Sequence, residues 1–310
     1  MLTVLQTALE VGLIYGLVAL ALFISFSILN IADLSTDGCF TLGCAVGAML
    51  TIAGHPILAL FAAMAAGMLS GYVTAFLQTR LGVESILAGI ISNTGLYTIN
   101  LAVMGFSSNV SITGVDTVFS LFKGLVGGQW SRLILLALIA AVLVLVLIRF
   151  FGTSIGLSIR ATGDSLDMVS ASSINPKATI TIGLCLANAL TALSGCLIGE
   201  YNKFCDINLG TGMVTIALAS LIIGEVFAGR RGSVGKRVVC VVLGSIVYRF
   251  IIALALRLNI SAEYFKLVSA VIVAVAIAAP NMKDYVHLAK IKSNARKLRA
   301  LSGKGDETDA

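Results

Sequence analysis

The stretch Ser131-Arg-Leu-Ile-Leu-Leu-Ala-Leu-Ile-Ala-Ala-Val-Leu-Val-Leu-Val-Leu-Ile-Arg-Phe150 decides the fold class of this chain. Between Arg132 and Arg149 it carries no charged residue. A helix needs about 20 apolar residues to cross roughly 30 Å of hydrocarbon. The stretch therefore predicts a membrane-spanning helix with an arginine near each end.

Similar apolar runs predict eight further spans along the chain, at 4–28, 38–53, 57–79, 84–106, 178–199, 212–228, 238–257 and 263–280. Of the 310 residues, 58% are hydrophobic and only 12% are charged. A soluble domain needs about twice that share of charge, so a soluble enzyme, a nucleic-acid binder and a disordered chain are excluded. We predict an all-α polytopic membrane protein with about 8–10 transmembrane helices.

Two of the predicted spans, 38–53 and 212–228, are short, and the segment 30–37 before the first of them is polar. Short or interrupted helices of this kind often line a path through the membrane. A re-entrant piece at 30–37 would also change the number of crossings, so the side of the N-terminus stays open.

The distribution of basic residues predicts the orientation. If the segment after residue 280 is cytoplasmic, fifteen of the 21 Lys and Arg residues fall on the cytoplasmic side. Because positive charge collects there, we predict a cytoplasmic C-terminus. The chain is expected to form one transmembrane domain over 1–282, followed by a basic tail at 283–310 that contacts anionic lipid.

No catalytic or cofactor site is found in the sequence. The segment Gly229-Arg-Arg-Gly-Ser-Val-Gly-Lys-Arg237 resembles a phosphate-binding loop, but Arg230 replaces a required glycine and Arg237 replaces the Ser or Thr that binds magnesium. The six cysteines form no CxxC pair, and Cys205 is the one expected to be exposed. We expect no cofactor and no metal in this chain.

Two connections between spans differ from the apolar background. In the predicted cytoplasmic connection 152–177, Asp164 or Ser165 is suited to cap a short helix running to about residue 173, and Pro176 is suited to open the next span. Such a helix is typical of docking into a partner's groove, although a solvated connector is the alternative. The outer connection 199–212 is either a ligand-receiving mouth or an ordinary loop.

Polar residues within the spans are candidates for lining a path, because they are costly in lipid. The candidates are Asp33, Asp37, Asn93, Asn100, Asn188 and Thr191. The alternatives are structural: Asp37 as the N-cap of the 38–53 helix, and the amide and hydroxyl groups as hydrogen bonds between helices. For Glu225 and Arg249 we favour a salt-bridged structural pair over a contact with a substrate carboxylate.

Several motifs together resemble a known family. They are Arg160-Ala-Thr-Gly-Asp-Ser-Leu-Asp-Met-Val-Ser-Ala-Ser-Ser-Ile-Asn-Pro176, Ala32-Asp-Leu-Ser-Thr-Asp-Gly-Cys-Phe-Thr-Leu-Gly43, Ser85-Ile-Leu-Ala-Gly-Ile-Ile-Ser-Asn-Thr-Gly-Leu-Tyr-Thr-Ile-Asn-Leu101, Gly210-Thr-Gly-Met213 with Ile222-Ile-Gly-Glu225, and 244–257. From about residue 10 to 283 the chain resembles the permeases of ABC importers of the branched-chain amino acid and ribose type. Within that superfamily it is closer to the tryptophan/tyrosine-type permeases.

The resemblance implies a permease of the vitamin B12/ribose type in the bacterial cytoplasmic (inner) membrane. Two copies would form a central path, two ABC ATPase subunits would carry ATP and magnesium, and an extracellular solute-binding protein would deliver a small solute, such as an aromatic or other amino acid. The loop 160–176 would couple the path to the ATPases. Its candidate coupling residues are Arg160, Gly163, Asp164, Asp167, Met168, Ser172, Ile174 and Asn175.

Two other functions remain open on the residues alone. A stand-alone ion-coupled secondary transporter would need a coupling site, for which Asp33 and Asp37 are the clustered carboxylates. A channel would need repeated pore-lining motifs, and the sequence has none.

Overall fold

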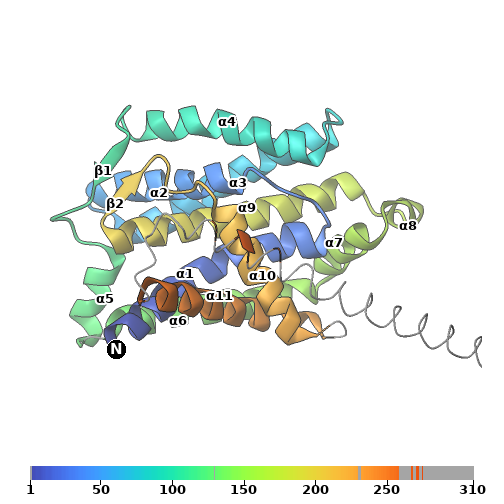
Figure 1. Ribbon diagram of the computed structural model, residues 1–310. Helices are drawn as coiled ribbons and strands as arrows, with labels where there is room; N and C mark the ends of the chain where they lie inside the picture. Colours follow the sequence, from blue (N-terminus) through green and yellow to red (C-terminus); the bar gives the residue numbers. More distant parts are fainter. Residues whose placement is uncertain are drawn as a thin grey trace, which may run out of the picture.

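The computed structural model describes residues 2–128, 130–229 and 232–257, together with the single positions 267, 270, 271 and 274. Helices dominate it, and they lie side by side along one direction (Figure 1). In chain order the elements are α1 (Leu2–Leu22), the π-helix η1 (Phe23–Ile28), α2 (Thr36–Ile52), α3 (Pro56–Thr79), α4 (Ser85–Val103), β1 (Asn109–Ser111), α5 (Val118–Val126), α6 (Ser131–Phe151), α7 (Ser154–Asp164), α8 (Leu166–Ala171), α9 (Pro176–Asn202), β2 (Phe204–Asp206), α10 (Met213–Ala228) and α11 (Val234–Arg257).

The all-α membrane fold predicted from the apolar runs is confirmed. In the described part of the chain, six helices are long and apolar enough to cross a membrane: Val4–Ile28, Pro56–Thr79, Ser85–Val103, Ser131–Phe151, Pro176–Asn202 and Val234–Ala255. The two runs predicted to be short form the shorter apolar helices α2 and α10. The predicted span 263–280, the boundary at 282 and the basic tail lie outside the continuously described residues.

The polar segment between α1 and α2 folds back into the protein. The π-helix η1 ends at Ile28, and Asn30 adopts a left-handed backbone conformation with φ 56°, which turns the chain. Asp33 then lies beside Asn188, close to the middle of α9. Helix α2 therefore begins about halfway along the length of α9 and runs parallel to it, until Thr51 meets Glu200 near the end of α9.

Helix α10 also begins inside the molecule. After α9, strand β2 pairs antiparallel with β1, with Cys205 opposite Val110. The chain then returns inward, where the amide of Gly210 donates a hydrogen bond to the hydroxyl of Thr41 on α2. From there α10 runs away from the strands, opposite in direction to α2.

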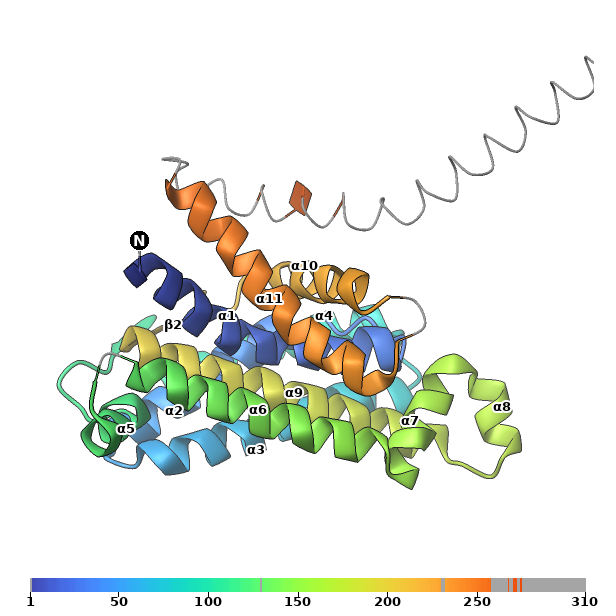
Figure 2. The ribbon, with the colours of Figure 1, turned by 90° about the horizontal axis from the view of Figure 1, so that it is seen from below.

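The segments α1–α2–α3 and α9–α10–α11 have the same arrangement with reversed direction. In each, a long helix is followed by an irregular turn, a short helix that starts inside the bundle, and a long helix packed antiparallel to the short one. Helix α3 packs against α9 and α11 packs against α1, so each half supplies the partner of the other (Figure 2). Inverted repeats of this kind place short helices at the centre of membrane transporters.

Glycines allow the central helices to touch through their backbones. Gly43 and Gly47 of α2 lie against Ala192 and Cys196 of α9, where a Cβ atom would overlap the neighbouring atoms. The Gly67/Gly71 pair of α3 contacts α9, and the Gly12/Gly16 pair of α1 contacts α11. Small residues four positions apart permit this close approach, since each turn of the helix presents the next one on the same face.

The two ends of the bundle differ in what they carry. Strands β1 and β2 with α5 lie at one end, and α7 and α8 lie at the other (Figure 1). We call these the strand end and the coupling end. Helices α1 and α9 are antiparallel, because Glu10 near the start of α1 accepts a hydrogen bond from Tyr201 near the end of α9. The N-terminus therefore lies at the strand end.

Candidate translocation and coupling sites

Asp33 is buried in the irregular turn before α2, where neutral groups surround its carboxylate. Its Oδ1 accepts hydrogen bonds from the amide and the hydroxyl of Ser35, at 2.8 and 2.6 Å. Its Oδ2 accepts a hydrogen bond from the side-chain amide of Asn188 at 2.9 Å. The carboxylate thus joins the start of α2 to the middle of α9, and its negative charge lies near the positive N-terminal end of α2.

Asp37 caps a helix other than the one expected from the sequence. It lies within the first turn of α2 rather than before it, so the assignment as the N-cap of 38–53 is wrong. Its two carboxylate oxygens accept hydrogen bonds from the amides of Gly212 and Val214 at the start of α10, both at 2.9 Å. The reason is tertiary: α10 begins beside α2, and its first amides have no acceptor within their own helix.

Asn93 and Asn100 both lie against Gly38 in the first turn of α2. The side-chain amide of Asn100 donates a hydrogen bond to the Gly38 carbonyl at 3.0 Å. The Oδ1 atom of Asn93 lies where a Cβ atom of Gly38 would stand. Both asparagines of α4 therefore face α2.

Five of the six candidate path residues surround the beginning of α2. Thr191 is buried elsewhere on α9 and bonds back to the carbonyl of Ala187. Within the described residues, Asn100 Oδ1 and Asn188 Oδ1 are buried and accept no hydrogen bond. Because a buried acceptor without a donor is costly, these two oxygens are places where a polar solute or a water molecule would be stabilised.

Glu225 pairs with a different arginine from the one predicted. Arg237 at the start of α11 lies 2.6 Å from Glu225 Oε1 and also donates a hydrogen bond to the hydroxyl of Ser27. Arg249 instead stacks on the ring of Tyr15, with its guanidinium carbon 3.7 Å from the ring centre. The predicted Glu225–Arg249 pair is wrong. Glu225 lies near the coupling end beside Arg237, and Arg249 lies about three helical turns further along α11.

The connection 152–177 contains two helices instead of one. Ser165 caps α8 by accepting a hydrogen bond from the amide of Met168, as predicted, and α8 ends at Ala171, two residues before the predicted end. Pro176 opens α9 behind the N-cap Asn175. Helix α7 was missed, although Thr153 is a capping residue that signals its start.

The candidate coupling residues divide into an inner and an outer group. Gly163 lies directly on the carbonyl of Ile28, so α7 rests on the end of η1. Arg160 and Ile174 are partly buried. The exposed members are Asp164, Asp167, Met168, Ser172 and Asn175.

Helix α8 presents apolar side chains outward. Leu166 and Met168 are 53% and 57% exposed, while Val169 is buried and holds α8 against the bundle. An exposed apolar pair on a short helix that rests on the core is suited to receive a partner protein.

The outer connection 199–212 is more structured than a solvated loop. Cys205, predicted to be exposed, is fully buried beneath the strand pair. The sequence around it does not reveal the partner strand β1, which lies nearly one hundred residues earlier. At this end, Glu200 accepts hydrogen bonds from Thr51 and from the amide of Val118, and so fixes α2 and α5 to α9.

Comparisons with known proteins decide the family. Residues 4–277 match the family described as "Branched-chain amino acid transport system / permease component". The chain belongs to this family. As a member of this permease family it is a multi-pass membrane transport subunit, and the resemblance noted from its motifs is confirmed.

Two relatives cover nearly the whole of this permease. The chain is 30% identical over 94% of its length to the "Tyrosine transport system permease protein" of Clostridioides difficile (strain R20291), of which 95% is covered. It is also 30% identical over 91% of its length to "Uncharacterized protein RP368" of Rickettsia prowazekii (strain Madrid E), of which 99% is covered. No solved structure matches the chain.

Proposed function

We propose that the chain is the transmembrane subunit of an ATP-driven importer for a small organic solute, an aromatic or other amino acid. Two copies would form the path, a solute-binding protein would deliver the solute at the strand end, and an ABC ATPase subunit would dock on each α7–α8 segment. In this arrangement the coupling end and the C-terminus face the bacterial cytoplasm. The permease family supports this assignment, and the name of the Clostridioides relative favours an amino acid as the solute.

The observation that carries the proposal is the position of α7 and α8. Leu166 and Met168 face outward for docking, while Gly163 of α7 rests on Ile28 at the end of η1. The next residues along the chain lead through the buried turn at Asp33 to the start of α2. A displacement of α8 by an ATPase would therefore reach the centre of the bundle through a short series of packed elements.

The proposed path passes the point where α2 and α10 begin. Both helix N-termini carry partial positive charge, and Asp33 and Asp37 compensate it. Asn100 Oδ1 and Asn188 Oδ1 supply neutral acceptors there. Neutral groups suit a path, because they can bind a solute without holding it as strongly as a buried opposite charge would.

An ion-coupled secondary transporter is less well supported. Its coupling carboxylates would be Asp33 and Asp37, but in this structure both accept hydrogen bonds that hold helices together. Uptake of an amino acid by the chain alone in liposomes, without any ATPase, would overturn the importer proposal.

The docking role of α8 can be tested by charge substitution. Leu166→Asp and Met168→Asp should each reduce copurification of the partner ATPase at least tenfold, because a charge replaces an apolar contact surface. The matched control is Phe106→Asp, which changes an apolar side chain at the strand end that is more exposed, at 75%, and lies at a left-handed position that Asp tolerates. Unchanged copurification by both α8 variants would contradict the docking role.

A further inference from the structure

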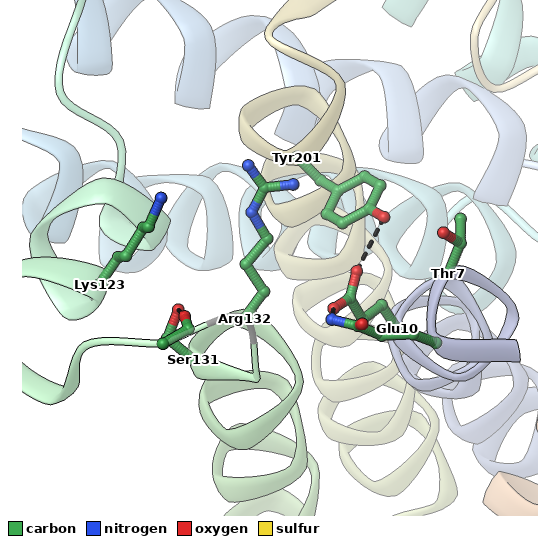
Figure 3. Close-up of a pocket in the computed structure, with 8 residues that line it drawn as sticks. Thr7, Glu10, Lys123, Ser131, Arg132 and Tyr201 are labelled. Atoms are coloured by element: carbon green, nitrogen blue, oxygen red, sulfur yellow. Dashed lines mark hydrogen bonds between the residues drawn. The ribbon is translucent and has the colours of Figure 1, made fainter. Parts of the chain in front are cut away.

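A cavity lies at the strand end of the bundle. It has a volume of about 280 Å³ and lies between α1, α5, α6 and α9 (Figure 3). Its lining includes Glu10 and Tyr201 from the two long central helices and Lys123 and Arg132 from α5 and α6. A second cavity of about 160 Å³ shares Lys123, Arg132 and Tyr201 with it.

Lys123 and Arg132 form no ion pair with a carboxylate in the part of the chain that the structure describes. Arg132 instead lies over the ring of Tyr201, 5.8 Å from its centre. Figure 3 shows both cationic side chains extending on the same side of the α6 N-terminus. Two cations and the first amides of a 21-residue helix together favour a bound anion.

The carboxylate of the cavity is held by neutral donors. Glu10 Oε1 accepts a hydrogen bond from Gln6 and Oε2 accepts one from Tyr201, both at 2.9 Å. Each oxygen of a carboxylate can accept a second hydrogen bond. Glu10 is 3% exposed, so a cation that reaches it through the cavity would meet a poorly hydrated negative charge.

We infer that this cavity binds a free amino acid, with its α-carboxylate between Lys123 and Arg132 and its α-ammonium at Glu10. The arrangement matches both charges of a zwitterion, whereas a simple anion would leave Glu10 without a cationic partner. The inference rests on the proposed function, because the cavity opens at the end where the solute would arrive. It adds a receiving site that lies outside the junction of α2 and α10.

The experiment measures binding of radiolabelled L-tyrosine to the full chain in nanodiscs of phosphatidylcholine, with no ATPase or binding protein present. We expect saturable binding to the wild type. Arg132→Gln and Lys123→Gln should each weaken binding at least tenfold. Arg80→Gln, which changes an arginine at the coupling end, should leave binding unchanged, and melting temperatures in the same nanodiscs check that every variant is folded.

The role of Glu10 has its own readout. Against the wild type, 3-(4-hydroxyphenyl)propionate, which lacks the ammonium group, should compete at least tenfold less well than L-tyrosine. In Glu10→Gln this difference should disappear, because the neutral amide cannot pair with the ammonium group, while its single oxygen still accepts a hydrogen bond from Gln6 or Tyr201. Tyramine, which lacks the carboxylate, should not compete with L-tyrosine for binding to the wild type or to Glu10→Gln.

Three results would overturn the inference: absence of binding to the folded wild type, equal affinity in Arg132→Gln, or loss of tyrosine binding only when phosphatidylethanolamine is added. The last result would assign the cavity to a zwitterionic lipid headgroup. These outcomes are separate from the proposed function, since ATP-driven uptake by the complete transporter could persist in each of them.

Discussion

At the scale of single residues, Asp33 and Asp37 connect parts of the chain that lie far apart in sequence. Asp33 reaches Asn188 on α9, and Asp37 reaches Gly212 and Val214 at the start of α10. A helix that begins inside a membrane protein has amides that water does not satisfy. The two carboxylates satisfy such groups, which explains why charged residues are found in the interior of this bundle.

We predict that Asp37→Ala destabilises the protein by about 1–2 kcal/mol, because the first amides of α10 lose their acceptors. The free energy of unfolding of Asp37→Asn should lie between those of Asp37→Ala and the wild type, since its single amide oxygen keeps one of the two hydrogen bonds. Thermal unfolding in detergent measures both effects. Equal stability of Asp37→Ala and the wild type would contradict the cap.

At the scale of helices, packing depends on positions that have no side chain. Gly43 of α2 lies on the backbone of Ala192, and Gly195 of α9 lies on the backbone of Phe40. The two helices approach through reciprocal glycines, so their separation is set by main-chain contact. In a membrane, where apolar association gives little advantage over lipid, such close packing is a main source of helix affinity.

Gly43→Ala is expected to destabilise the bundle by about 1–3 kcal/mol, because the added methyl group overlaps the Ala192 carbonyl. Gly95 on α4 provides the control. A Cβ atom there meets nothing within 4 Å, and alanine favours a helix, so Gly95→Ala should stabilise by about 0.5–1 kcal/mol. Detergent melting temperatures compare the two, and a stabilised Gly43→Ala would refute the contact.

At the scale of the whole molecule, the arrangement fixes which segments share a side of the membrane. The N-terminus lies at the strand end with β1 and β2, and α8 lies at the opposite end. In sealed vesicles, a membrane-impermeant maleimide should therefore label a cysteine at Ser172 from one side only, and a cysteine at Ser108 from the other. An N-terminal tag should be accessible from the side of the membrane that labels the cysteine at Ser108. Access to the tag from the side that labels the cysteine at Ser172 would contradict the topology.

The fold class, the six long apolar helices and the family motifs follow from the sequence alone. Apolar length and the start signals at Ser165 and Pro176 act over a few neighbouring residues, so they can be read locally. The shortness of the runs 38–53 and 212–228 likewise predicted two short helices, and α2 and α10 are those helices.

The contacts between residues from distant segments follow from the tertiary structure alone. It assigned Asp37 to α10, Arg237 rather than Arg249 to Glu225, and Cys205 to a buried strand pair. It also brought Glu10, Lys123, Arg132 and Tyr201 to one cavity. These contacts join residues from distant helices, and their positions follow from the return of the chain at Asn30 and the packing of two reversed halves. Local sequence cannot encode a partner that folding alone brings near.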